Sequence, residues 1–157
     1  AGIDIGSGNP EVIITRLWVQ YCPVGIRATT NSHNVKINKC VVINNRNVGV
    51  LIEQCRNAQV INSIIVNGDY GLVFKTCKNA AAIHNTIFMP GTITSQERSI
   101  AGIWAQTAPD FGGLTGDTGF LWFIGNCVWN MTGEALSVSD HDVDIGAIRS
   151  NYNNSFF

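Results

Sequence analysis

The feature that most constrains the fold of this chain is a pattern that returns after 22 residues. Residues 49–66 are GVLIEQCRNAQVINSIIV, and residues 71–88 are GLVFKTCKNAAAIHNTIF. Both segments contain, in the same order, a glycine, an apolar run, a cysteine, an asparagine, a second apolar run, a second asparagine and a third apolar run. A fixed period between about 20 and 50 residues is typical of solenoids, propellers and arrays. The repeat therefore predicts stacked units.

A second alignment extends this repeat over most of the chain. Six short segments align on one position, which holds Thr15, Asn38, Asn62, Asn85, Asn126 and Asn154. The first three steps between these positions are 23, 24 and 23 residues, and the last two are 41 and 28. Insertions explain the longer steps, and two candidates are residues 90–99 and residues 107–119.

The repeated runs have the composition of β-strands. They are four to six residues long, rich in Val, Ile, Phe and Trp, and separated by Gly, Asn and Asp. Helical repeats need longer segments with a period of 3.6, and no stretch of this sequence offers them. Three strands in each unit predict an all-β parallel solenoid of about six coils, forming a single domain over residues 1–157. Equivalent residues then stack about 4.8 Å apart.

Stacking also explains the recurring asparagine. A buried amide must find partners, and an Asn in every coil can bond the amides above and below it. In these segments the chain resembles the right-handed parallel β-helix of the pectate-lyase-like superfamily, which carries an asparagine ladder between its second and third strands. The resemblance covers residues 13–157 and implies a ladder of Asn38, Asn62, Asn85, Asn126 and Asn154. It implies no single activity, because many functions share this scaffold.

The alternation of strand residues predicts which side chains of the first sheet point inward. The expected inward positions follow each repeating glycine: Ile26, Ala28, Val50, Ile52, Leu72, Phe74, Ile103 and Ala105. The expected outward positions lie between and after them: Arg27, Thr29, Leu51, Glu53, Val73, Lys75, Trp104 and Gln106.

Four of the outward residues, Arg27, Glu53, Lys75 and Trp104, form the main candidate site. The resemblance implies a substrate groove on this face. There Arg27 or Lys75 could bind or deprotonate an acidic sugar, Glu53 could hold an ion or act as an acid or base, and Trp104 could stack on a sugar ring. The alternative is a solvated face on which Glu53 pairs with Arg27 or Lys75. Glycoside hydrolysis normally needs two carboxylates and this column offers one, so no complete catalytic signature is present and enzymatic activity stays open.

Other candidate residues lie in less regular segments. Asp110 and Asp117, in the second insertion, flank the same face and are further candidates for carbohydrate binding or for a decorative loop. The run SDHDVD offers Asp140, Asp142 and Asp144 as calcium ligands, although an ordinary polar turn explains it as well. Cys55 and Cys77 occupy equivalent places, and stacked thiols are favoured over a disulfide.

Composition limits the kinds of partner that this chain is expected to bind. Charged residues make up 13% of the chain and the net charge is −1, which gives no electrostatic footprint for nucleic acid. No apolar stretch is long enough to span a membrane. No capping helix is visible at either end, so we expect further chain, a capping partner or a homo-oligomer.

Two functions fit these observations. The first is a secreted or surface protein that binds or processes polysaccharide along the outer face of the first sheet, although the polygalacturonase motifs NTD, GHG and RIK are absent. The second is a non-catalytic structural or adhesive shaft, such as a phage tailspike segment or a surface fibre, at the surface of a cell or virion.

Overall fold

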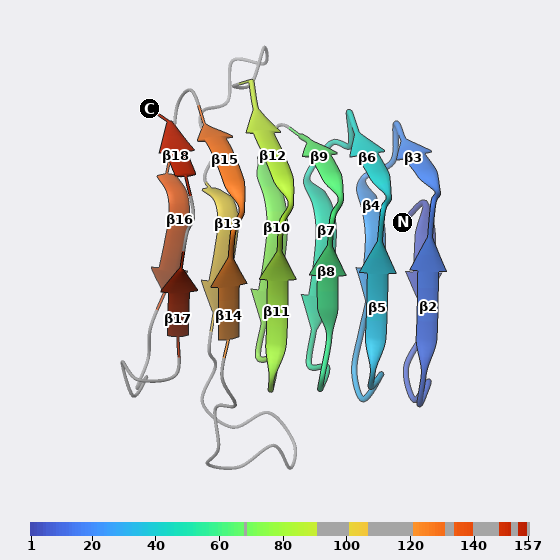
Figure 1. The fold of residues 1–157 in the computed structure, drawn as a ribbon. Coiled ribbons are helices and arrows are strands. Elements are labelled where there is room, and N and C mark those ends of the chain that lie inside the picture. Colours follow the sequence, from blue (N-terminus) through green and yellow to red (C-terminus); the bar gives the residue numbers. More distant parts are fainter. Residues whose placement is uncertain are drawn as a thin grey trace.

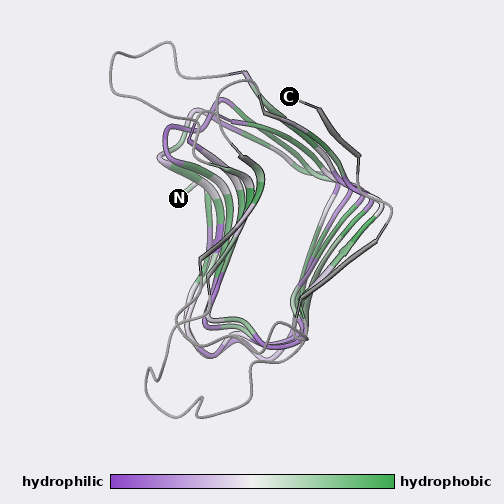
Figure 2. Ribbon diagram, turned by 90° about the vertical axis from the view of Figure 1, so that its left-hand side faces the viewer, coloured by the Kyte–Doolittle hydropathy of each residue, from purple (hydrophilic) through white to green (hydrophobic). Residues whose placement is uncertain are grey.

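The structure, a computed structural model, describes residues 1–67, 69–90, 101–106, 121–130, 134–139, 148–151 and 154–156. The regular secondary structure of these residues consists of β-strands alone, and the strands wind into a solenoid with three walls (Figures 1 and 2). Neighbouring strands in each wall are parallel and come from successive turns of the chain. The predicted all-β parallel solenoid is therefore confirmed.

Each wall is a six-stranded sheet. The first sheet contains β1 (Ile3–Ile5), β4 (Val24–Ala28), β7 (Val48–Glu53), β10 (Tyr70–Lys75), β13 (Ala101–Gln106) and β16 (Glu134–Ser139). The second sheet contains β2 (Val12–Thr15), β5 (Val35–Asn38), β8 (Gln59–Ile61), β11 (Ala80–Ile83), β14 (Leu121–Ile124) and β17 (Ile148–Asn151). The third sheet contains β3 (Trp18–Gln20), β6 (Val41–Ile43), β9 (Ile64–Val66), β12 (Thr86–Met89), β15 (Cys127–Asn130) and β18 (Asn154–Phe156).

The interior of the solenoid is filled by columns of apolar side chains. All eight inward positions predicted for the first sheet are at most 2% exposed, which confirms the predicted alternation: Ile26, Ala28, Val50, Ile52, Leu72, Phe74, Ile103 and Ala105. Large and small residues complement one another across the core. The rings of Phe74 and Phe123, from the first and second sheets, lie 6.2 Å apart between their centroids. The strand neighbours of these two residues, Ala105 and Ala82, leave room for the rings.

The repeating glycine that opens the strands of the first sheet is required by close packing. A Cβ at Gly49 would come within 2.6 Å of the carbonyl oxygen of Gly71, and one at Gly71 within 2.5 Å of the carbonyl oxygen of Gly102. Real Cβ atoms are essentially never found this close to backbone oxygen. The glycine therefore recurs because the next strand of the first sheet, together with the Cγ2 of Ile65 or Ile87 from the third sheet at 2.6 Å, leaves no room for a side chain.

The corners between sheets turn through residues in the left-handed region. Between the second and third sheets these are Arg16, Lys39, Asn62, His84 and Gly125, with φ angles of 50 to 60°. Between the first and second sheets, Asn34, Asn57 and Asn79 adopt φ angles of 52 to 54°. Asn tolerates this conformation better than most residues. The backbone N–H groups of six of these residues donate to a carbonyl of the next turn: Arg16, Lys39, Asn62, His84, Asn34 and Asn57.

The column of buried polar residues differs from the predicted asparagine ladder. Asn85 and Asn126 are each 1% exposed, and they continue through Ser63 to Cys40 in a chain of side-chain-to-backbone hydrogen bonds. This ladder therefore contains two asparagines, a serine and a cysteine.

The remaining predicted members of the ladder fall in other columns. Asn38 pairs with Ile61 and not with Asn62, which is exposed and lies at the left-handed corner position. Asn154 pairs with Cys127, one residue after Asn126. The predicted alignment was wrong at these three positions, because it placed asparagines opposite one another. In the structure the left-handed corner residues lie opposite one another, and the ladder residue follows the corner residue.

Candidate functional site

The outer face of the first sheet carries two parallel columns of side chains. The strand register places Arg27, Leu51, Val73 and Trp104 in one column, after Asp4 on β1. Glu53 and Lys75 lie in the next column, two residues further along their strands. Val73 is 2% exposed despite its outward position, since Leu51 and Trp104 flank it.

Arg27 is held by an acid from the preceding turn. Its Nε donates to Oδ1 of Asp4 at 3.2 Å, and its Nη2 donates to Oδ2, so that the pair is bidentate. The hydrogen bond to Asp4, followed by its charge, raises the pKa of the guanidinium. The same hydrogen bond lowers the pKa of Asp4, which is therefore a firmly ionised carboxylate and not an acid catalyst.

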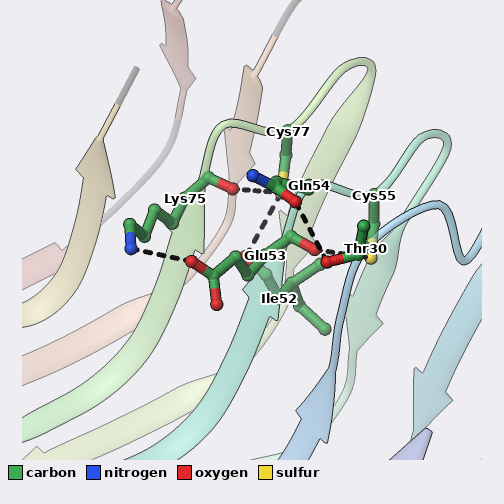
Figure 3. A network of polar contacts seen from close by, with 7 residues as sticks. All are labelled: Thr30, Ile52, Glu53, Gln54, Cys55, Lys75 and Cys77. Atoms are coloured by element: carbon green, nitrogen blue, oxygen red, sulfur yellow. Dashed lines mark hydrogen bonds and ion pairs between the residues drawn. The ribbon is translucent and has the colours of Figure 1, made fainter. Parts of the chain in front are cut away.

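Glu53 and Lys75 form a second ion pair between adjacent turns. Nζ of Lys75 donates to Oε1 of Glu53 at 2.7 Å, and both side chains are half-buried at the ends of β10 and β7 (Figure 3). An ammonium that donates to a carboxylate acts as a hydrogen-bond donor, and it is poorly placed to take a proton from a sugar. Beside the pair, Oγ1 of Thr30 donates to Oε1 of Gln54 at 3.0 Å.

Trp104 has an aromatic partner on the preceding strand. The ring centroids of Tyr70 and Trp104 lie 5.3 Å apart with an interplanar angle of 34°, and both residues are half-buried. Desolvation, followed by the nearby charge of Asp69, raises the pKa of the Tyr70 phenol, which therefore remains a neutral hydroxyl at ordinary pH. The two rings form a partly exposed aromatic platform on β10 and β13, and Leu51 and Val73 separate it from Arg27 in the first column.

The structure brings the four main candidates onto one face, but in two columns. Arg27 and Trp104 share the first column, and Glu53 and Lys75 share the second. Glu53 pairs with Lys75, as the alternative interpretation expected, while Arg27 pairs with Asp4. The other candidates lie outside the described residues: Asp110, Asp117, Asp140, Asp142 and Asp144.

Sequence reasoning missed two members of this site, Asp4 and Tyr70. Asp4 precedes its partner Arg27 by 23 residues, the repeat length, so the period alone could have paired them. Tyr70 immediately precedes a repeating glycine, at the position that Val48 holds one turn earlier. That alignment places Tyr70 one strand before Ala101 of β13, but its contact with Trp104 depends on the reach of the two rings.

Comparison with known proteins identifies the fold family. The sequence matches the family described as "Right handed beta helix region" over residues 1–111. The chain belongs to this right-handed β-helix family. Searches of curated proteins and of solved structures found no match. Membership gives the handedness of the solenoid described above, whereas its function has to be argued from the residues on its faces.

Beneath the ion pair, the interior of this β-helix holds two stacked thiols. Cys55 and Cys77 are buried and unbonded, as predicted. The thiol of Cys77 donates to the carbonyl oxygen of Ile52 at 3.2 Å, and that of Cys55 donates to the carbonyl oxygen of Glu53 at 3.2 Å (Figure 3). Burial raises the pKa of Cys55 to about 11 and that of Cys77 to about 12. Both are therefore packing residues and poor nucleophiles.

The described residues contain neither a metal-binding cluster nor a membrane-spanning helix. Their His, Cys, Asp and Glu side chains form no group of three that could hold a metal ion. These residues also contain no helix with the length and apolar character needed to cross a membrane.

Proposed function

We propose that this β-helix is a secreted or surface protein that binds a polysaccharide along the outer face of its first sheet. The observation that carries the proposal is the partly exposed pair of Tyr70 and Trp104, with ring centroids 5.3 Å apart, on the same sheet face as two ion pairs. An aromatic face packs against the CH face of a pyranose ring, and polar groups around it bond the sugar hydroxyls. The outward side chains of successive strands line up along the axis, which gives an extended chain a continuous surface beside the ring pair.

The ion pairs leave hydrogen-bonding capacity for such a ligand. Arg27 donates to Asp4 through Nε and through one hydrogen of Nη2, so the two hydrogens of Nη1 and the second hydrogen of Nη2 remain for an acceptor on the ligand. Lys75 has three donors, of which one reaches Glu53, and Glu53 keeps its second oxygen as an acceptor. Because both cations are neutralised within the protein, the face favours a neutral sugar chain over an acidic one.

The proposal is for binding and not for turnover. A glycosidase needs a carboxyl group that remains protonated near neutral pH in addition to an ionised one. Asp4 is held ionised by Arg27, and Glu53 accepts a hydrogen bond from Lys75. Neither carboxylate is free in the described site, so the arrangement supports recognition alone.

The test is binding to a panel of neutral polysaccharides, measured by affinity electrophoresis with and without calcium. The Trp104→Ala variant should lose binding by about tenfold or more, since aromatic contacts dominate such sites. The matched control is Trp18→Ala, because Trp18 is 65% exposed on the outer face of the third sheet. Equal binding by wild type and Trp104→Ala, or an equal loss in the control, would overturn the proposal.

A second candidate function, the non-catalytic shaft, is favoured by the outer face of the third sheet. This face is rich in exposed apolar side chains, among them Trp18 at 65%, Ile64 at 47% and Trp129 at 50%. The rings of Phe88 and Trp129, on neighbouring strands, meet edge to face with centroids 5.5 Å apart. Its outward positions on the first five strands carry no charge: Trp18, Gln20, Val41, Ile43, Ile64, Val66, Thr86, Phe88, Cys127 and Trp129.

A shaft of this kind would associate laterally through that face. Sedimentation analysis over a range of concentrations should then detect oligomers, and Ile64→Lys should dissociate them because it places a charge in the contact. Monomers at every concentration would eliminate this second function.

A further inference from the structure

The outer side of the third sheet exposes large side chains from several turns of the solenoid. Trp18, Ile64 and Trp129 are exposed on its strands, and Leu17 and Tyr21 are exposed just before and just after β3. We call these five residues the third-sheet face. An exposed patch of this kind marks a surface that contacts a protein or a membrane.

Two residues of the third-sheet face suit a boundary between water and lipid. Nε1 of Trp18 donates to Oε1 of Gln20 at 3.0 Å, so the indole ring can leave water without an unsatisfied donor. Tyr21 is 74% exposed and has a φ of 59°, a costly conformation for a bulky residue that persists mainly at functional sites. Trp and Tyr are enriched at the headgroup level of membranes, because each ring has an apolar body and a polar tip.

Cations border the third-sheet face at both of its corners. Arg16 and Lys39 hold equivalent left-handed positions at the corner with the second sheet, where Figure 2 shows hydrophilic residues gathered. Arg46 is exposed at the corner with the first sheet. The two ion pairs of the described residues lie on the first sheet and include none of these cations. Asp69 is the one acid that the described residues place at either corner.

The second candidate function places another copy of the chain on this face, and the position of the cations favours a different occupant. Two copies packed face to face about a twofold axis bring the cations of one corner against those of the same corner or of the other corner. Like charges placed opposite one another weaken such a contact. An anionic bilayer instead meets both corners with charge of the opposite sign, while its interfacial layer accepts the aromatic rings.

We propose that the third-sheet face docks on the surface of a bilayer that contains anionic phospholipids. Trp18, Tyr21 and Ile64 enter the interfacial layer, and the cations of the two corners contact the charged headgroups. The corners are already fixed by backbone hydrogen bonds, such as that from the N–H of Lys39 to the carbonyl of Ile61 at 3.1 Å, so docking orders few groups. The first sheet forms a different wall of the solenoid and remains open to a polysaccharide.

The test is co-sedimentation of the full chain with vesicles of phosphatidylcholine and phosphatidylserine in equal parts, compared with vesicles of phosphatidylcholine alone. The mixed vesicles should bind about tenfold or more tightly, and this difference should shrink between about 0.05 and 0.5 M NaCl. Trp18→Ala should weaken binding to the mixed vesicles by about tenfold, because binding scales with the apolar area that enters the interface. Arg16→Gln/Lys39→Gln should weaken it by about tenfold or more through the lost charges.

Each variant has a matched control elsewhere on the solenoid. Trp104→Ala removes the same side chain from the first sheet, and Arg56→Gln/Lys78→Gln removes the same charge from the corner between the first and second sheets. Both should bind mixed vesicles within about twofold of wild type. Soluble glycerophosphoserine, which is the headgroup without acyl chains, should not displace the protein from the vesicles. This last control separates a lipid surface from a free anion.

The outcomes that contradict membrane docking are distinct. No binding of wild type to mixed vesicles would overturn the proposal, and soluble oligomers that Trp18→Ala dissociates would then assign the third-sheet face to a second copy. An equal loss of binding in a variant and its control, or displacement by glycerophosphoserine, would also overturn it. None of these results bears on polysaccharide binding, which Trp104→Ala tests on the first sheet.

Discussion

Oδ1 of Asn126 accepts two hydrogen bonds from Asn85, one from its backbone N–H and one from its Nδ2, each at 3.0 Å. Nδ2 of Asn126 in turn donates to the carbonyl oxygen of Ala82 at 2.9 Å. Both asparagines are 1% exposed, so no water replaces these bonds when one partner is removed. The pair therefore joins two turns of the solenoid at the corner between the second and third sheets.

Asn126→Ala should lower the free energy of unfolding by about 1–3 kcal/mol, because it leaves the N–H of Asn85 buried without an acceptor. Urea unfolding followed by circular dichroism measures the change. The control is Asn47→Ala, at an exposed position, which should stay within about 0.5 kcal/mol of wild type. Equal stability of the two variants would show that the buried amide contributes nothing to the junction.

The sequence predicted the first sheet better than the ladder, and the reason is physical. In the first sheet the glycine is needed at one place in each turn, because a Cβ at Gly49 or Gly71 would meet backbone oxygen. It therefore marks the strand frame, and the inward positions follow by alternation. At the corner before the ladder, the left-handed position accepts Arg16, Lys39, Asn62 and His84 alike, so no residue type marks it.

The candidate site was predicted in part for a related reason. Outward positions such as Arg27 and Trp104 follow from the frame of the first sheet. Their partners lie one turn away and depend on side-chain reach, as with Asp4 and Tyr70.

Gly71→Ala should destabilise the protein by about 1–3 kcal/mol or more, because the new methyl group meets the carbonyl oxygen of Gly102 at 2.5 Å and Cγ2 of Ile87 at 2.6 Å. Thermal unfolding is a sufficient measurement. Gly6→Ala is the matched control, since a Cβ there has no atom within 4 Å and should change stability by less than about 0.5 kcal/mol. An unchanged melting temperature for Gly71→Ala would contradict the close approach between the first and third sheets.

The ion pair of Glu53 and Lys75 should contribute little to stability. Both side chains are partly exposed, and such pairs contribute about 0.2–1 kcal/mol and weaken with salt. A double-mutant cycle with Glu53→Gln and Lys75→Gln, measured by urea unfolding at low and high salt, gives the coupling energy directly. A coupling above about 2 kcal/mol that persists in high salt would mean that the pair is effectively shielded from solvent, contrary to its exposure.

The thiol of Cys77 should make stability depend on alkaline pH. Burial raises its pKa from 9.0 to about 12, so the folded protein holds this proton more tightly than the unfolded chain does. The contribution is fully present below pH 9.0, and it is lost as the pH rises from there towards about 12, by about 1.4 kcal/mol for each pH unit. The pKa of Cys55 is raised from 9.0 to about 11, so this thiol adds a similar loss of stability over a narrower range of pH.

Cys77→Ala removes one of these two titrations and leaves the other. Its free energy of unfolding should therefore fall less steeply above pH 9.0 than that of wild type, even if the variant is less stable at neutral pH. Comparing the slopes, and not the absolute values, separates the titration of Cys77 from the cavity that the substitution creates. Parallel curves for the two proteins between pH 9.0 and pH 11 would mean that the Cys77 thiol titrates normally and is reached by solvent in the folded state.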